Sequence, residues 1–345
     1  MKSNNNDTVL LREYNIPIYS LVFAQFFHPL VDLFGIIGNI WILLTLAFGK
    51  VPISHATKFY YSIIGLSDLS IVLCNFLWTD LCDALWIWTE GKTYFCFDIL
   101  SLFSCIITNL WGFLSELVSN YALVALSIER LIAVCFPFRA KSILNRKFTL
   151  YLLLILISPS FILYSVVIPL SSAITPYIRV IPFICYFDYS TIFGIIFKVS
   201  MPIIILGIHT IVDLIVSLII FFKLYFINKN SALISKPKTT SKELSATLTL
   251  LFLCAINIII YGICLVSYVA TVVFSYWVHV SDEILSFSYT IFYMFITSTA
   301  LPHSINILVY LALIPPFRRA AFCNFFSSKN KQQSISSANA LVPSQ

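Results

Sequence analysis

The chain has 345 residues, of which 59% are hydrophobic and only 10% are charged. A soluble globular domain carries about 25% charged and about 45–50% apolar residues, so this composition excludes one and indicates a protein embedded in a lipid bilayer. The formal net charge of +6 is then expected to follow membrane topology, and no nucleic-acid partner is predicted from it.

Seven apolar runs are long enough to cross a bilayer, which takes about 20 helical residues for ~30 Å of hydrocarbon. They lie at 21–48, 57–81, 101–130, 148–170, 191–225, 244–274 and 284–314. We therefore predict an all-α integral membrane protein, a seven-transmembrane helix bundle with a short amphipathic eighth helix. The expected segments are an extracellular N-terminus at 1–20, a membrane domain at 21–314, a surface helix at 315–326 and a disordered tail at 327–345.

Positive charges divide unevenly between the two ends of the predicted bundle. Sixteen of the 21 lysines and arginines fall between alternate runs or after the last run, and most of the acids fall on the other side. Loops rich in lysine and arginine usually lie on the cytoplasmic side of a membrane. The N-terminus is on the opposite side and is therefore predicted to lie outside. No cleavable signal peptide is expected, because the chain begins with a polar segment. Asn6, in Asn6-Asp7-Thr8, is a glycosylation candidate on the outer side.

Four polar side chains are predicted to share one depth near the middle of the membrane. Asp68 lies ten residues beyond Lys58, and Asn39, Ser119 and Asn306 lie eleven residues before Lys50, Arg130 and Phe317, which mark the cytoplasmic boundary. At ~1.5 Å per residue all four are about 15–16 Å from the inner face. An unpaired carboxylate there is costly, so Asp68 should face the interior and find donors or a cation.

Polar residues also follow one stripe of the run 101–130. Counting back from Arg130 by helical turns places Ser119, Glu116 and Gly112 on or near the same face. Glu116 is ~21 Å from Arg130, in the outer half, where a ligand cavity would open. The alternative for Glu116 is a hydrogen-bonded structural carboxyl. Gly112, Glu116 and Tyr261, which lies in the run 244–274, are the ligand-pocket candidates.

Cysteine positions suggest how the outer loops are held. Cys105 precedes Arg130 by 25 residues, or ~37 Å of helix, which puts it at the outer end of its run. Cys185 lies in the loop on the same side, so a Cys105–Cys185 disulfide is feasible and would pin that loop over the bundle mouth. Cys82 and Cys96 could form a second pair, although several pairings remain open.

The segment after the last run alternates bulky apolar and basic residues, as a helix lying on membrane lipids would. Cys323, at its end, is a candidate for palmitoylation.

Several short motifs are spread over residues 20–323. They are Glu129-Arg130-Leu131 with Cys135-Phe136-Pro137, Gly38-Asn39, Leu66-Ser67-Asp68-Leu69, Asn306-Ile307-(x2)-Tyr310 and Phe317-Arg318. In the same relative register, they resemble the D/E-R-Y and C-x-P segments, the signatures of the first two helices, the NPxxY motif and the eighth helix of the rhodopsin-like (class A) G-protein-coupled receptors.

The resemblance implies a two-state switch at the cytoplasmic face. Arg130 paired with Glu129 would hold the inactive state, and its release would open a crevice for a heterotrimeric G protein or arrestin. Asn306 and Tyr310 would belong to the same coupling switch. Asp68, Ser119 and Asn306 fall on the family's sodium-site positions, so bound Na⁺ is the one cofactor that the resemblance implies. The protein would lie in the plasma membrane and bind an extracellular peptide or small-molecule ligand.

The chain departs from the family at several motif positions. Ile307 replaces the usual proline, Leu131 the usual tyrosine, and 244–274 has neither the Trp nor the Pro of the C-W-x-P switch. Gly112 stands where amine receptors carry an aspartate, which argues against an amine ligand. Acidic residues on the outer side favour a cationic neuropeptide over a small chemosensory molecule. In these respects the chain is similar to divergent invertebrate receptors of the FMRFamide-like or chemosensory type.

A multi-helix transporter or ion-conducting protein is the alternative function. Asp32, Asp68, Glu116 and Asp213 could line an ion path, and His209 could share a hydrogen bond with Asp213 one turn away. Against a transporter, the sequence has no internal repeat and no pair of broken helices in matching halves. An enzyme is not expected, because no HExxH, GxSxG or glycine-rich phosphate loop occurs.

Overall fold

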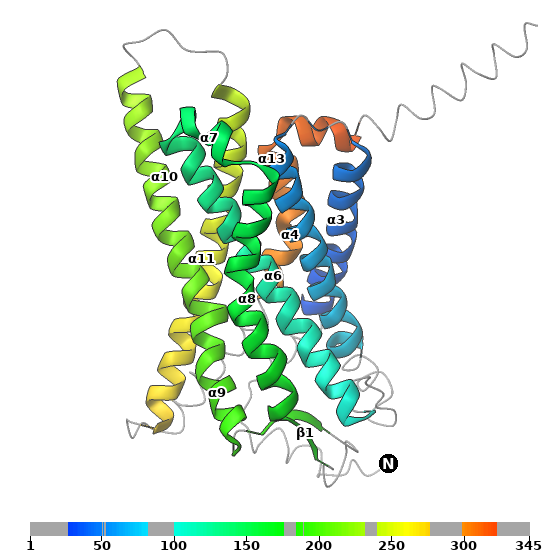
Figure 1. The fold of residues 1–345 in the computed structure, drawn as a ribbon. Coiled ribbons are helices and arrows are strands. Elements are labelled where there is room, and N and C mark those ends of the chain that lie inside the picture. Colours follow the sequence, from blue (N-terminus) through cyan, green and yellow to red (C-terminus); the bar gives the residue numbers. More distant parts are fainter. Residues whose placement is uncertain are drawn as a thin grey trace, which may run out of the picture.

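The computed structural model is a bundle of long helices that run side by side (Figure 1). Nearly all of the described residues are helical, as an all-α membrane protein requires. The described residues are 27–49, 51, 53–81, 100–175, 184–188, 190–231, 240–276 and 299–322. The predictions for Asn6, Cys82, Cys96, Cys323 and the segments 1–20 and 327–345 lie outside these residues.

Two of the long helices contain a π-helical segment. The elements in chain order are α3 (His28–Phe48), α4 (His55–Asn75), η2 (Phe76–Asp80), α6 (Leu102–Cys135), α7 (Pro137–Ile143), α8 (Arg146–Ser171), β1 (Ser172–Thr175), β2 (Ile184–Phe187), α9 (Ile192–Met201), η4 (Pro202–Ile208), α10 (His209–Ser231), α11 (Thr240–Tyr276) and α13 (Ala300–Leu313). The segment η2 continues α4, and η4 joins α9 to α10. Pro202 opens η4, where it has no N–H to continue the α-helical bonding.

Five helical segments of the described chain are long and apolar enough to cross a membrane: His28–Phe48, Leu102–Cys135, Arg146–Ser171, Ile192–Phe226 and Thr247–Thr271. A sixth is reached if α13 and the helix Pro315–Phe322, bent from it by 100°, form one span. These helices indicate a multi-pass membrane protein. Seven spans remain a prediction, because α4 carries Lys58 and Asp68 and is not among the five, and most of 284–314 lies outside the described residues.

The most buried of these helices is α6. Within its apolar window 67% of the residues are buried, against 28–39% in the other four spans. It packs against α4, α8 and α10, and therefore forms the centre of the bundle. A capping box starts it: the Ser101 hydroxyl accepts from the Ser104 backbone N–H, and the Ser104 hydroxyl accepts from the Ser101 N–H. It ends at Cys135, just before Phe136-Pro137, where proline cannot continue a helix.

Two glycines allow α3 and α13 to approach closely. A Cβ at Gly38 would lie 2.7 Å from Ile307 Cγ2, and a Cβ at Gly35 would collide with Ser304. A larger residue at either position would push the two helices apart. This close approach lets Asn39 reach the backbone of α13, where its side-chain amide donates to the His303 carbonyl at 2.8 Å.

A disulfide and a strand pair close one end of the bundle. Cys105 at the start of α6 is joined to Cys185 in β2, with 5.6 Å between the two Cα atoms, so the predicted pairing is present. The strands β1 and β2 are antiparallel, and Ile174 is paired with Cys185. Beyond β2, hydrogen bonds from Ser190 to Asp188 hold the pKa of the Asp188 carboxyl below its usual value.

Candidate functional site

Three of the predicted midplane residues meet at the Asp68 carboxylate. The Ser119 hydroxyl donates to Asp68 Oδ1 at 2.5 Å, and the Asn306 amide donates to Oδ2. The three residues come from α4, α6 and α13, and Asp68 has no exposed surface. The structure thus brings together the three sodium-site candidates, as depth counting along the helices had predicted.

A third partner of Asp68, His303, was not identified from the sequence. Its Nδ1 lies 2.7 Å from Asp68 Oδ1, and the residue is 3% exposed. His303 precedes Asn306 by three positions on α13, so both side chains lie on one face of that helix. This i,i+3 spacing is the signal that could have found it.

Tyr261 on α11 extends these contacts toward the outer half of the bundle. Its hydroxyl lies 2.9 Å from His303 Nε2, and it donates to Glu116 Oε1 at 3.2 Å. Tyr261 is fully buried, whereas Glu116 is partly exposed. Glu116, Tyr261, His303 and Asp68 therefore form a continuous line of hydrogen-bonding groups, here called the polar chain. It joins α6, α11, α13 and α4.

Two arrangements of the same number of protons satisfy the polar chain. In one, Tyr261 donates to an ionised Glu116, and a doubly protonated His303 donates to the tyrosine oxygen and to Asp68. In the other, a protonated Glu116 donates to Tyr261, Tyr261 donates to His303 Nε2, and a neutral His303 donates through Nδ1 to Asp68. Passing between them shifts one proton from His303 to Glu116 through the Tyr261 hydroxyl. A charge brought near Glu116 would therefore be felt at the midplane.

A small cavity lies beside the polar chain. Its volume is about 20 Å³, which is enough for one water molecule or an ion of similar size. Asp68, Ser119, His303, Asn306 and Asn257 form its polar wall. The side-chain oxygens of Asp68, Ser119, Asn257 and Asn306 fit Na⁺ chemically. His303 offers only nitrogen and already contacts Asp68, so a bound cation would compete with it for that carboxylate.

The Glu129–Arg130 pair predicted on α6 is buried, and Arg130 also contacts another helix. Arg130 Nη2 lies 3.8 Å from Glu129 Oε1 and also donates to the Thr57 hydroxyl on α4. Among the described residues Glu129 Oε2 has no hydrogen-bond partner. Arg130 is therefore held between Glu129, its neighbour in the sequence, and the start of α4.

The other two predicted switch residues make different contacts. Asn306 belongs to the midplane group at Asp68. Tyr310 packs between Tyr61 and Phe317, with ring-centroid distances of 4.7 and 5.6 Å, and its hydroxyl has no hydrogen-bond partner among the described residues. Phe317 lies in the helix that follows the 100° bend. Tyr310 thus links the end of α13 to α4 by ring packing.

The three ligand-pocket candidates do not all lie together in the structure. Glu116 and Tyr261 are in contact through the polar chain. Gly112 instead faces α4, because a Cβ at this position would lie 3.5 Å from Cys74 Sγ.

The hydrogen bond predicted between His209 and Asp213 is not formed. Asp213 Oδ1 instead accepts from the Ser127 hydroxyl at 3.1 Å, across to α6. The His209 ring packs edge-on against Tyr261 at 4.9 Å. Position i,i+4 brings two side chains to one face of a helix, but the neighbouring helices offered both residues other partners.

The chain matches no protein-family model and no curated protein. Its functional assignment therefore rests on its own residues: the polar chain in the bundle interior, the Arg130 contacts at one end, and the disulfide at the other.

Proposed function

We propose that this protein is a receptor of the rhodopsin-like G-protein-coupled type, located in the plasma membrane with its N-terminus outside. It binds an extracellular ligand and activates heterotrimeric G proteins through its cytoplasmic face. The observation that carries the proposal is the polar chain from Glu116 to Asp68, because it connects an accessible group in the outer half to the midplane residues of four helices.

The disulfide supports the proposed orientation. Cys105 and Arg130 lie near opposite ends of α6, and disulfides persist on the oxidising side of a membrane. The Cys105 end is therefore assigned to the outside and the Arg130 end to the cytoplasm. The same assignment follows from the uneven distribution of lysine and arginine.

Ligand recognition is assigned to the outer half of α6. Glu116 is partly exposed and carries the acidic group that a cationic ligand requires. An arginine side chain of an amidated neuropeptide would pair with this carboxylate, and a small cationic chemosensory molecule would use the same group. Pairing would favour ionised Glu116 and thus the arrangement in which His303 carries the positive charge.

The polar chain would then relay ligand binding to α11, the role that the Trp and Pro of the C-W-x-P switch have in the family. Tyr261 is the only member on α11, and a Cβ at the neighbouring Gly262 would meet nothing within 4 Å, so α11 has room to move at this level. A ligand that binds one state better shifts the population toward that state. Moving the cytoplasmic end of α11 would open the crevice for the Gα subunit or for arrestin.

The output end would be the Arg130 contacts. A buried charge pair adds little to stability but suits an element with two alternative arrangements. Arg130 is held by Glu129 and Thr57 in this structure, and its release would free the guanidinium to contact the G protein.

A proton- or ion-conducting protein is the second candidate, because the polar chain consists of groups that can exchange protons. The positions of the other carboxylates favour it less. Asp213 is bonded to Ser127, and Asp32 lies with His28 and Asp80 at the outer end, so these two acids do not extend the polar chain.

A coupling assay tests the proposal. Cells co-expressing the chain and a promiscuous Gα subunit are exposed to a library of amidated peptides, and second-messenger output is measured. Arg130→Ala should abolish the output while surface expression is retained, and Arg146→Ala, which removes an exposed arginine at the start of α8, should leave it unchanged. Equal output from the wild type and Arg130→Ala would contradict the receptor mechanism. An ion current that persists in Arg130→Ala would favour the second candidate.

A further inference from the structure

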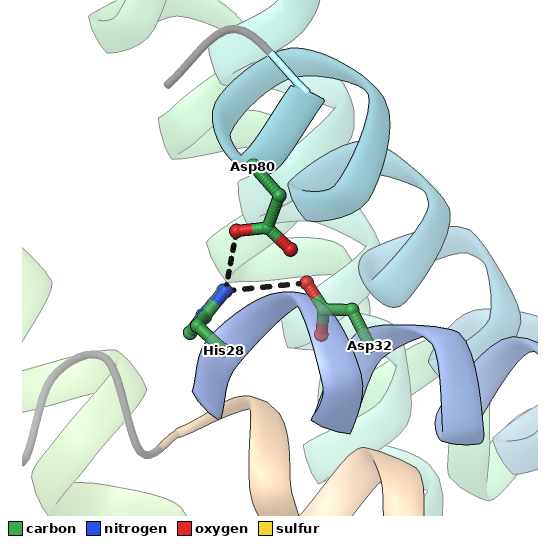
Figure 2. Close-up of side chains that lie close together, drawn as sticks. All are labelled: His28, Asp32 and Asp80. Carbon is green, nitrogen blue, oxygen red and sulfur yellow. Dashed lines mark hydrogen bonds and ion pairs between the residues drawn. The ribbon is translucent and has the colours of Figure 1, made fainter. Parts of the chain in front are cut away.

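A second cluster of ionisable side chains lies at the outer end of α3 and η2, away from the polar chain. Figure 2 shows His28, Asp32 and Asp80 pointing toward one another. His28 Nδ1 lies 2.8 Å from Asp80 Oδ1 and 3.4 Å from Asp32 Oδ2. We propose that these three residues bind one divalent transition-metal ion of the zinc type.

The local structure brings the three ligands to one point. His28 and Asp32 are one turn apart on α3, which places them on the same face. Asp80 ends the π-helical segment η2, and such segments rotate the residues that follow relative to a regular helix. Because α3 packs against η2, Asp80 faces the two α3 side chains.

The carboxylates of Asp32 and Asp80 are buried and have too few hydrogen-bond donors around them. Asp32 has no exposed surface, and apart from the 3.4 Å approach of His28 Nδ1 to Oδ2 its oxygens have no hydrogen-bond donor among the described residues; Asp80 Oδ2 also has none. Buried like charges repel, and an unpaired buried carboxylate is costly. A divalent cation would balance the two negative charges and satisfy these oxygens together.

Two of the three separations between ligand atoms are close to those around a tetrahedral ion. For metal–ligand bonds of ~2.0–2.1 Å, the distance between two ligand atoms is roughly 3.3 Å. The two measured separations, 2.8 and 3.4 Å, bracket that value, and all three ligand atoms lie within 4.8 Å of one another. Three protein ligands leave a fourth position for water or another donor. The imidazole nitrogen favours zinc-type ions over Ca²⁺ and Mg²⁺, which prefer oxygen ligands.

The cluster lies where ions from the aqueous phase can reach it. His28 precedes the midplane residue Asn39 by eleven positions, or ~16 Å of helix, and Asp80 follows Asp68 by about the same rise. Half the hydrocarbon thickness is ~15 Å, so both ligands are at the edge of the apolar layer. The His28 side chain is 13% exposed, which provides an entry for the ion.

Direct metal binding tests this proposal without reference to signalling. The purified full-length chain in lipid nanodiscs, with its free thiols alkylated, is dialysed to equilibrium against Zn²⁺, and bound metal is measured by mass spectrometry. The wild type should bind one Zn²⁺ saturably, and Asp32→Asn and His28→Gln should each lose that equivalent. His55→Gln, which changes an exposed histidine at the other end of the bundle, should retain it.

A spectroscopic measurement on the wild type covers the case in which the variants fail to fold. Co²⁺ in this site should give the visible absorption of a four-coordinate ion with nitrogen and oxygen ligands, and Zn²⁺ should abolish it. Absence of saturable Zn²⁺ binding by the wild type would overturn the proposal. So would an unchanged stoichiometry in both folded variants, or a Co²⁺ spectrum of a six-coordinate hydrated ion. None of these outcomes depends on whether the protein couples to G proteins.

Discussion

Replacing Tyr261 by phenylalanine should interrupt the polar chain and destabilise the folded protein. The change removes one hydroxyl, which in this structure serves both His303 Nε2 at 2.9 Å and Glu116 Oε1 at 3.2 Å. A buried polar group left without a partner costs about 1–3 kcal/mol. His303 is 3% exposed and should bear this cost in full, while the partly exposed Glu116 should bear less of it. We expect a total destabilisation of about 2–4 kcal/mol.

Thermal unfolding in detergent and ligand-independent second-messenger output measure the two consequences of Tyr261→Phe. Tyr61→Phe is the matched control, because Tyr61 is 1% exposed and its hydroxyl has no hydrogen-bond partner among the described residues. It should change stability little. Tyr261→Phe should lower stability and also alter output per receptor at the surface. A double variant with Glu116→Gln should be non-additive, since both changes alter the same contact.

Equal effects of Tyr261→Phe and Tyr61→Phe on stability and output would refute the polar chain as a connection between Glu116 and Asp68. Additive effects of Tyr261→Phe and Glu116→Gln on stability would also contradict it, because independent sites add and contacting sites do not.

Further changes test other parts of the bundle. Gly38→Ala should destabilise the protein by about 1–3 kcal/mol through overpacking against Ile307, whereas Gly262→Ala meets nothing within 4 Å and should be neutral or stabilising in the same unfolding assay. Cys185→Ser should lower the free energy of unfolding by about 2–5 kcal/mol and reduce surface expression, because it removes the disulfide between α6 and β2. Cys135→Ser, which replaces a free thiol, should do neither. Replacing Na⁺ by choline should lower the melting temperature of the wild type but not of Asp68→Asn; an equal response of the two would remove the sodium site.

Depth along a helix could be predicted from the sequence, because the rise per residue is fixed. Counting from the cytoplasmic ends placed Asp68, Ser119 and Asn306 at one level, and the structure has them in contact. The start of α6 was predicted from its apolar run: the run 101–130 begins one residue before Leu102, but the helix continues five residues beyond the run, to Cys135. The same counting predicted that Cys105 lies at the outer end of its helix and that the loop with Cys185 lies on the same side, so the disulfide could be anticipated.

Rotation of each helix about its own axis could not be predicted. His303 was missed because its partner is set by how α13 is turned toward α4, and Thr57 was missed because Arg130 crosses to another helix. The His28, Asp32 and Asp80 cluster depends on a π-helical segment that no residue pattern announces. Such contacts follow from packing between helices, and apart from the i,i+3 spacing of His303 and Asn306 no local signal in the sequence marks them.

The burial of α6 has a consequence for how this protein tolerates change. From Leu117 to Arg130 almost every side chain is buried, and several of these are small, such as Ala122 and Ala125 at 0% exposure. A larger side chain there would meet several helices at once. The outer turns around Gly112 and Glu116 are only partly buried. We therefore expect a mutational scan to find the segment Leu117–Arg130 intolerant and the turns around Gly112 and Glu116 permissive. Under the proposed receptor function, preference for a ligand could then diversify without rebuilding the end proposed to signal.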